Sequence, residues 1–108
     1  MDMKTGALEI AREYKTALAA LLGDDLLNVF LYGSQARGDA DEGSDIDVLC
    51  LMKGSFDYGS LIKRTSEITA AISLSHDVII SRVFATKADF DHRQLPFFMN
   101  VRRDRVAV

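Results

Sequence analysis

The residues with the clearest chemical potential are a glycine-serine pair and two aspartates that follow it. Gly33 and Ser34 come directly after one apolar segment, and after ten intervening residues Asp45 and Asp47 open a second. On a strand, residues two apart project from the same face, so these Cα atoms would lie about 6.5 Å apart. Carboxylates this close repel each other, and a hard divalent cation between them relieves the repulsion. The spacing therefore predicts a magnesium site.

The glycine-serine pair has the properties of a phosphate-binding turn. Gly33 lacks a Cβ, so the backbone can approach a ligand closely, and Ser34 begins a segment whose N–H groups would face that ligand. Arg37 follows on the same turn and is placed to help hold a triphosphate. We assign nucleotide binding to these three residues together with Ser44.

A third acidic residue, Asp77, opens a predicted strand over 77–84. If that strand lies beside the one carrying Asp45 and Asp47, the Asp77 carboxylate could bind a second metal ion or accept the proton of an attacking hydroxyl. Sequence alone does not establish this adjacency. With two magnesium ions, the attacking oxygen and the leaving pyrophosphate would be held in line across the α-phosphorus, and catalysis would consist of positioning and charge stabilisation.

The elements that must position these groups follow from hydrophobic periodicity and capping signals. The predicted order is a helix over 5–22, a buried strand over 26–32, a turn or very short helix from Gly33, a strand over 46–52, a helix over 56–74 capped by Ser55 or Asp57, the strand over 77–84, and a short helix opened by a capping box at 86–89 that ends before Pro96. This order predicts one domain over residues 1–108, of the α/β (α+β) class, with helices packed on one face of a mixed sheet.

Composition restricts the function classes. The chain has 108 residues and a formal net charge of -3, which argues against a surface that coats nucleic acid. No apolar run reaches the length of a membrane span, so we expect no membrane association. The single Cys50 cannot form an internal disulfide, and no signal-peptide pattern opens the chain, so we expect a cytoplasmic protein.

Several polar residues are interpreted as structural. Cys50 falls on the strand face opposite the two aspartates, which predicts a buried thiol rather than a nucleophile. The arginine cluster near the end of the chain could contact nucleotide, RNA or an acidic partner, but we interpret it as a solvated or partner-facing surface. These structural assignments cover the loop charges Asp39, Asp41 and Glu42, the histidines His76 and His92, and the arginines Arg102, Arg103 and Arg105.

Taken together, the motif resembles the DNA polymerase β-like nucleotidyltransferase superfamily and, within it, the minimal nucleotidyltransferases. The family pattern is Gly-Ser, a short helix, Asp-x-Asp on a strand and a third acidic residue on a later strand. Gly33, Ser34, Asp45, Asp47 and Asp77 match these places in order. The similarity extends over nearly the whole chain and implies a palm-like core without an additional helical domain.

One position departs from the family pattern. Gln35 stands where many relatives carry arginine after Gly-Ser, which weakens the case for a strong phosphate clamp there, although Arg37 remains.

The resemblance also implies a reaction and a partner. Minimal members form toxin–antitoxin pairs with HEPN-domain ribonucleases, in some cases by adenylylating a tyrosine of the toxin. We therefore expect magnesium-dependent transfer of AMP from ATP, or of another nucleoside monophosphate, to a hydroxyl of a HEPN toxin, in a hetero-oligomer or homodimer. Two alternatives stay open: a non-catalytic antitoxin that masks its toxin by binding, and an enzyme that modifies a small molecule such as an antibiotic.

Overall fold

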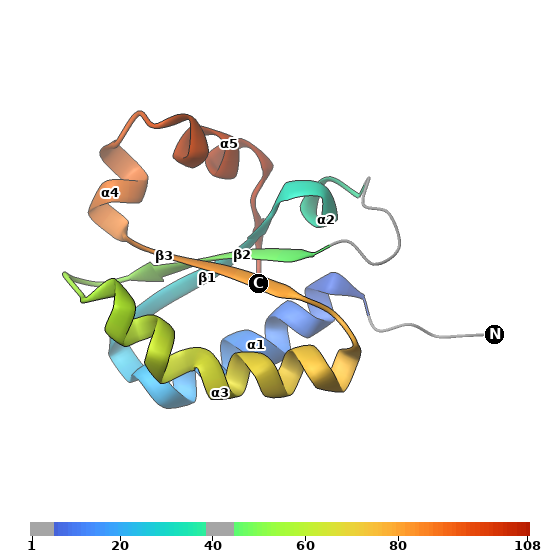
Figure 1. The fold of residues 1–108 in the computed structure, drawn as a ribbon. Helices are drawn as coiled ribbons and strands as arrows, with labels where there is room; N and C mark the ends of the chain where they lie inside the picture. Colours follow the sequence, from blue (N-terminus) through green and yellow to red (C-terminus); the bar gives the residue numbers. More distant parts are fainter. Residues whose placement is uncertain (1–5, 39–44) are drawn as a thin grey trace.

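Up to the short helix before Pro96, the order of helices and strands agrees with the order expected from the sequence, and a further helix and a short strand follow it (Figure 1). The computed structural model describes residues 6–38 and 45–108. Its elements are α1 (Ala7–Leu22), a 3-10 turn η1 (Gly23–Asp25), β1 (Leu26–Tyr32), α2 (Gly33–Arg37), β2 (Ile46–Met52), α3 (Tyr58–His76), β3 (Ile80–Thr86), α4 (Lys87–His92), α5 (Pro96–Asp104) and β4 (Val106–Ala107). The predicted bounds of β1 and β2 are confirmed.

The strands form one mixed sheet in the order β3-β2-β1-β4. β1 is antiparallel to both β2 and β4, whereas β2 and β3 run parallel. A parallel neighbour requires a crossover, and α3 provides it between β2 and β3. The two central strands, β2 and β1, each pair with a strand on both sides, which agrees with their nearly continuous apolar sequences.

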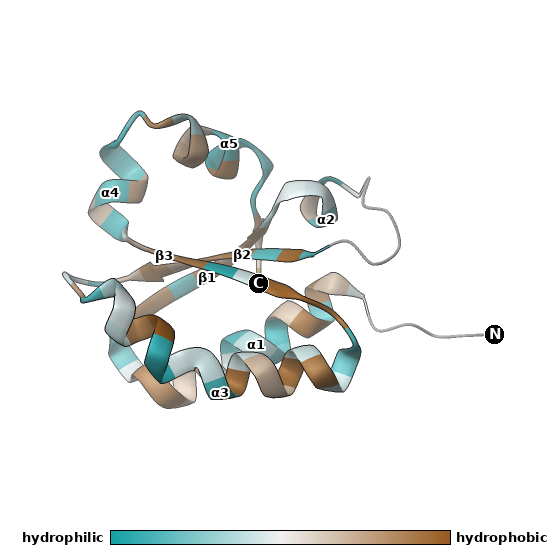
Figure 2. Cartoon of the chain, in the orientation of Figure 1, coloured by the Kyte–Doolittle hydropathy of each residue, from teal (hydrophilic) through white to brown (hydrophobic). Residues whose placement is uncertain are grey.

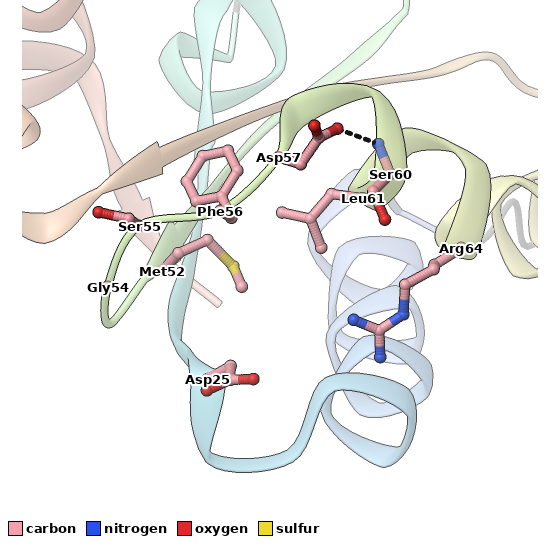
Figure 3. A pocket seen from close by; sticks show the side chains of 9 residues that line it. All are labelled: Asp25, Met52, Gly54, Ser55, Phe56, Asp57, Ser60, Leu61 and Arg64. Atoms are coloured by element: carbon pink, nitrogen blue, oxygen red, sulfur yellow. Dashed lines mark hydrogen bonds between the residues drawn. The ribbon is translucent and has the colours of Figure 1, made fainter.

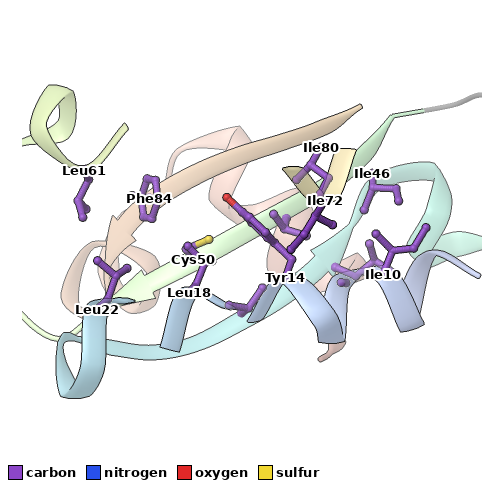
Figure 4. Close-up of a cluster of buried hydrophobic side chains, with 14 of the residues drawn as sticks. Ile10, Tyr14, Leu18, Leu22, Ile46, Cys50, Leu61, Ile72, Ile80 and Phe84 are labelled. Atoms are coloured by element: carbon purple, nitrogen blue, oxygen red, sulfur yellow. The ribbon is translucent and has the colours of Figure 1, made fainter. Parts of the chain in front are cut away.

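One face of the sheet is covered by the two long helices, α1 and α3. Alternate residues of β2, among them Val48 and Cys50, join Tyr14 and Leu18 of α1 in a buried cluster (Figure 4). Figure 2 shows α1 and α3 alternating between teal and brown along their length, as expected for amphipathic helices. The hydroxyl groups of Tyr14 and Thr69 share a buried hydrogen bond of 2.6 Å that links α1 to α3.

The opposite face of the sheet carries a second layer, so the prediction of helices on one face only is wrong in this detail. Phe30, Leu49 and Leu51 face away from α1 and α3 and form a separate buried cluster with Phe90 of α4 and Phe98 of α5. Figure 1 shows α4 and α5 on the side of the sheet opposite α3. Both helices are short, and their patterns did not reveal which face of the sheet they cover.

The end of α3 corrects a second prediction, because Asp77 does not begin a strand. The helix continues to His76, and Asp77 follows as its C-cap in the left-handed conformation, with φ 53°. The N–H groups of Asp77 and Val78 donate to the carbonyls of Leu74 and Ser73. This is the Schellman arrangement, in which a left-handed residue satisfies the last helix carbonyls. Aspartate tolerates this conformation better than most residues, since its short polar side chain bonds locally.

Two capping predictions are confirmed. The Asp57 side chain accepts a 2.8 Å hydrogen bond from the Ser60 N–H at the start of α3, and the Thr86 hydroxyl accepts one of 3.1 Å from the Asp89 N–H at the start of α4. Pro96 then occupies the first turn of α5, where its missing N–H costs no helix hydrogen bond. Among the helices of the described ranges, none has both the length and the apolar character needed to span a membrane.

Candidate active site

The glycine-serine turn and the second aspartate lie in direct contact. Gly33 follows β1 with φ 74°, a conformation that favours glycine. An added Cβ at Gly33 would lie 2.7 Å from Asp47 Oδ2, closer than real Cβ contacts. Glycine is therefore favoured here by the backbone angle, and a methyl group at this position would also force the Asp47 carboxylate to move.

Asp47 lies on β2, and Asp45 lies directly before that strand, close enough for its charge to act on the Asp47 carboxyl. Asp47 pairs with Tyr32 across the β1–β2 ladder, while Ile46 and Val48 turn to the opposite face and are buried under α1 and α3. Asp45 is exposed directly before β2, whereas Asp47 is partly buried. Burial raises the pKa of the Asp47 carboxyl, and the neighbouring Asp45 charge raises it further.

This pair of carboxylates suits a magnesium ion. The donors are hard oxygen atoms. Burial, and after it the Asp45 charge, raises the pKa of Asp47, and a cation between the two groups would offset the repulsion between them. Magnesium takes one or two protein carboxylates and completes its shell with water and phosphate oxygens. Within residues 6–38 and 45–108, no three His, Cys, Asp or Glu side chains gather closely enough to hold a metal ion. Among the described residues, the carboxylates at this position are those of Asp45 and Asp47.

Asp77, the predicted third ligand, is not brought to this pair. The β2–β3 register sets Ile80 beside Ile46, so Asp77 lies three residues before the paired part of β3, at the end of α3. The residue that does lie beside Asp47 is Ser81, and its hydroxyl donates a 3.3 Å hydrogen bond to Asp45 Oδ2. The sequence prediction placed the start of the strand at Asp77 and so did not identify Ser81 as the residue beside Asp47.

The remaining predicted nucleotide-binding residues lie on α2 or beyond it. Ser34 stands in the first turn of α2, where helix N–H groups have no acceptor within the helix and suit phosphate oxygens. Arg37 lies at the end of α2, and its guanidinium donates to Asp104 Oδ2 of α5 at 3.1 Å. The Arg37 side chain is still 46% exposed, so a phosphate would compete with Asp104 for it. Ser44 lies outside the described residues, as do the loop charges at 39, 41 and 42.

A pair of aromatic rings next to Asp47, those of Tyr32 and Phe97, was not predicted from the sequence. Tyr32 is partly buried, and its ring meets that of Phe97 edge to face at 5.6 Å. Burial and the adjacent Asp47 charge raise the pKa of Tyr32 to about 12, so its phenol stays neutral at physiological pH. Phe97 remains 37% exposed. The position of Tyr32 directly before Gly33 could have indicated from the sequence that this ring lies at the site. The contact with Phe97 could not be inferred, because it depends on how α5 packs.

The arginine cluster is largely structural. The Arg102 guanidinium donates to the carbonyls of Phe90 and Arg93 and so ties α5 to the end of α4. The Arg105 guanidinium lies over the Phe30 ring, 4.9 Å from its centroid, which is a cation–π distance. Arg103 is exposed and pairs with its neighbour Asp104. Cys50 is fully buried, as predicted, and burial raises the pKa of its thiol to about 12.

A pocket of about 260 Å³ opens at the other end of β2 (Figure 3). Its lining includes Met52, the last residue of β2, and Arg64 of α3. Met52 is five residues along the strand from Asp47, which corresponds to about 16 Å. The pocket is therefore separate from the aspartate pair. Gly54 and Ser55 line the pocket, where Gly54 lies in a bend and Ser55 follows it.

Comparison with known proteins agrees with the class of site that this geometry defines. The sequence profile described as "Nucleotidyltransferase domain" matches residues 11–97. The chain therefore belongs to the nucleotidyltransferase domain family, and it is a nucleotidyltransferase.

Two relatives come from Methanocaldococcus jannaschii. "Putative protein adenylyltransferase MJ0141" is 39% identical over 82 residues, covering 74% of this chain and 80% of the relative. "Putative protein adenylyltransferase MJ0604" is 28% identical over 82 residues, covering 76% of each.

The fold is also found in solved structures. A nucleotidyltransferase structure from Sulfolobus solfataricus superposes with a TM-score of 0.65 at 22% identity, covering 99% of this chain and 89% of the other. A toxin–antitoxin structure with AMP-PNP has a TM-score of 0.61 at 17% identity, covering 88% of this chain and 69% of the other. At these identities the likeness concerns the fold.

Proposed function

We propose that this chain is a magnesium-dependent nucleotidyltransferase that transfers AMP from ATP to a hydroxyl group of a partner protein. The observation that carries the proposal is the contact between the Gly33 turn and the Asp47 carboxylate. It joins a backbone suited to phosphate oxygens with a carboxylate pair suited to a divalent cation. A triphosphate bound at the turn would bring its phosphate oxygens beside Asp45 and Asp47.

In the proposed reaction, the acceptor hydroxyl oxygen attacks the α-phosphorus, the bond to the bridging oxygen breaks, pyrophosphate leaves, and the hydroxyl proton passes to solvent. Magnesium would neutralise charge that develops on the phosphate oxygens. The Ser34 turn would hold the donor's phosphate groups, and Asp45 and Asp47 would hold the cation. Arg37 would exchange part of its contact with Asp104 for the triphosphate.

The choice of a protein acceptor is supported by the relatives named as protein adenylyltransferases. The choice of a toxin is supported by the resemblance to minimal nucleotidyltransferases and by the fold shared with a toxin–antitoxin structure that contains AMP-PNP. We therefore propose a HEPN-domain toxin as the partner, with this chain as its antitoxin.

The test uses ATP labelled at the α-phosphorus, with magnesium, this chain and the product of the adjacent open reading frame. Label is expected on the partner protein, and ATP labelled at the γ-phosphorus should leave none. Asp45→Asn and Asp47→Asn should each reduce transfer at least a hundredfold, while Asp24→Asn, an exposed aspartate of η1, should have no effect. Pyrophosphate release with no label on the partner would reject the acceptor, and an active Asp47→Asn variant would reject the site.

A second candidate is an antitoxin that masks its toxin by binding alone. It is favoured by one observation, which is that the described residues bring together two carboxylates and a serine rather than three carboxylates. Under this reading the double variant Asp45→Asn, Asp47→Asn would still neutralise the toxin in a growth assay. Under the catalytic reading the same variant would leave the toxin active.

A further inference from the structure

The strand β3 carries a serine at the position nearest both aspartates. Ser81 is paired with Asp47 in the parallel β2–β3 ladder. Paired residues on neighbouring strands lie about 4.8 Å apart and project from the same face. The Ser81 hydroxyl in turn donates to Asp45 Oδ2 at 3.3 Å. Ser81 is therefore a neighbour of both carboxylates.

We infer that Ser81 fixes the number of divalent cations that the protein holds by itself at one. This inference rests on the proposed function, because it concerns the cation site formed by Asp45 and Asp47. Two carboxylates supply two negative charges, which balance a single divalent cation. A second cation held nearby would need a further anionic ligand, and at the position beside both aspartates the chain provides a neutral hydroxyl.

Ser81 also restricts the Asp45 carboxylate. Its hydrogen bond occupies one lone pair of Oδ2 and leaves the other oxygen, Oδ1, available to a cation. Asp45 is exposed and precedes the strand, so this long hydrogen bond favours one orientation of a carboxylate that solvent would otherwise leave free to rotate. Ser81 is accordingly a positioning residue, and a second cation would enter only with the negative charge of the nucleotide phosphates.

Replacing Ser81 by aspartate should supply the further anionic ligand that a second cation needs. A carboxylate at 81 would stand beside Asp47 and within reach of Asp45, giving three negative charges on one face of the sheet. Without a cation the three carboxylates repel one another, so the Ser81→Asp variant should have a lower melting temperature than the wild type. With cations the same cluster should bind two of them.

The test is a manganese titration of the nucleotide-free protein, followed by electron paramagnetic resonance, which measures free Mn²⁺. The wild type is expected to bind one ion per chain and Ser81→Asp two. Ser81→Asn is the matched control without the added charge, and Ser75→Asp adds the same charge at an exposed site on α3. Both controls should bind one ion. In chelator, Ser81→Asp should melt below the wild type, and Mn²⁺ should raise its melting temperature more than that of the wild type.

The outcomes separate this inference from the proposed function. Two ions bound by the wild type would overturn the inference, and so would a single ion bound by folded Ser81→Asp. The wild-type count decides the matter even if Ser81→Asp does not fold in chelator. Retention of Mn²⁺ by Asp47→Asn would instead remove the cation site on which the proposed function depends.

Discussion

Gly33 offers the most direct test of how the site is assembled, through the substitution Gly33→Ala. The new methyl group would meet Asp47 Oδ2 at 2.7 Å, so the oxygen must retreat by about 0.7 Å to reach the 3.4 Å at which contacts become ordinary. The backbone at Gly33 also keeps φ 74°. The variant therefore combines a backbone cost with a contact cost.

The two costs can be separated by magnitude. Holding a non-glycine residue in a left-handed conformation costs about 1–2 kcal/mol. Moving the Asp47 side chain away from its present rotamer adds about 0.5–1.5 kcal/mol. Gly38→Ala is the matched control, because Gly38 has φ 79° and no atom within 4 Å of an added Cβ. We expect Gly33→Ala to be about 1 kcal/mol less stable than Gly38→Ala, or about 4–8 °C lower in melting temperature.

The assay is urea denaturation in the presence of a chelator, combined with a double-mutant cycle. Asp47→Ala removes the carboxylate that the new methyl group meets, so in that background Gly33→Ala and Gly38→Ala should cost the same. Gly33→Ala should also weaken Mn²⁺ binding by roughly three- to tenfold, since about 1.4 kcal/mol corresponds to a factor of ten. Gly38→Ala should leave Mn²⁺ binding unchanged.

Equal stability of the two single variants would refute the reasoning, because the contact with Asp47 would then contribute nothing. The same conclusion would follow if the extra cost of Gly33→Ala persisted in the Asp47→Ala background. Either result would show that the glycine-serine turn and the Asp47 carboxylate do not affect each other's stability.

Three further predictions follow from the buried groups. Asp47→Asn should raise the stability of the metal-free protein at pH 7 more than at about pH 3.5, below the ordinary carboxyl pKa of 3.8. The pKa of Asp47 is raised in the folded state, so the contribution of its carboxyl to stability is present at low pH and is lost as pH rises through that pKa. Urea denaturation in chelator measures this, and a constant difference between the two pH values would contradict it. Burial raises the pKa values of Tyr14 and Tyr32 to about 12. Absorbance at 295 nm should therefore show two phenols ionising well above pH 10, and the stability of the protein should fall between about pH 10 and 12. Complete ionisation of the folded protein near pH 10 would argue against the burial of both side chains. Cys50 is buried with a raised pKa, so a thiol reagent such as DTNB should react only after unfolding, and rapid reaction of the native protein would show that the core opens.

The proposed cation site illustrates a conflict between stability and function. The carboxylates that suit magnesium repel each other when the cation is absent, and burial adds to the cost for Asp47. The surrounding structure maintains this arrangement, with Val48 and Cys50 on the opposite side of β2 held in the core under α1 and α3. The sheet thus supplies the stability that the site lacks.

The sequence was sufficient where structure depends on short-range patterns. The bounds of β1 and β2, the short helix after Gly33 and the capping of α4 by Thr86 all follow from a few consecutive residues. It was insufficient at the end of α3, where Asp77 completes a Schellman motif in place of the more usual glycine. The two-residue strand β4 was also missed, because it exists only through its pairing with β1.

By itself, the sequence determined that a glycine-serine pair precedes two closely spaced aspartates at the start of a strand. The strand period of two residues predicted that Asp45 and Asp47 share a face, although only Asp47 lies within β2. The tertiary structure alone decided that the Asp47 carboxylate lies against Gly33 and that Ser81, not Asp77, is the neighbour on β3. The physical reason is that the β2–β3 register is set by the packing of the long crossover helix α3 and by its C-cap. The Asp47–Ser81 pairing joins residues 34 positions apart, and the Gly33–Asp47 contact joins residues 14 positions apart, one directly after β1 and the other on β2, so no local pattern records either.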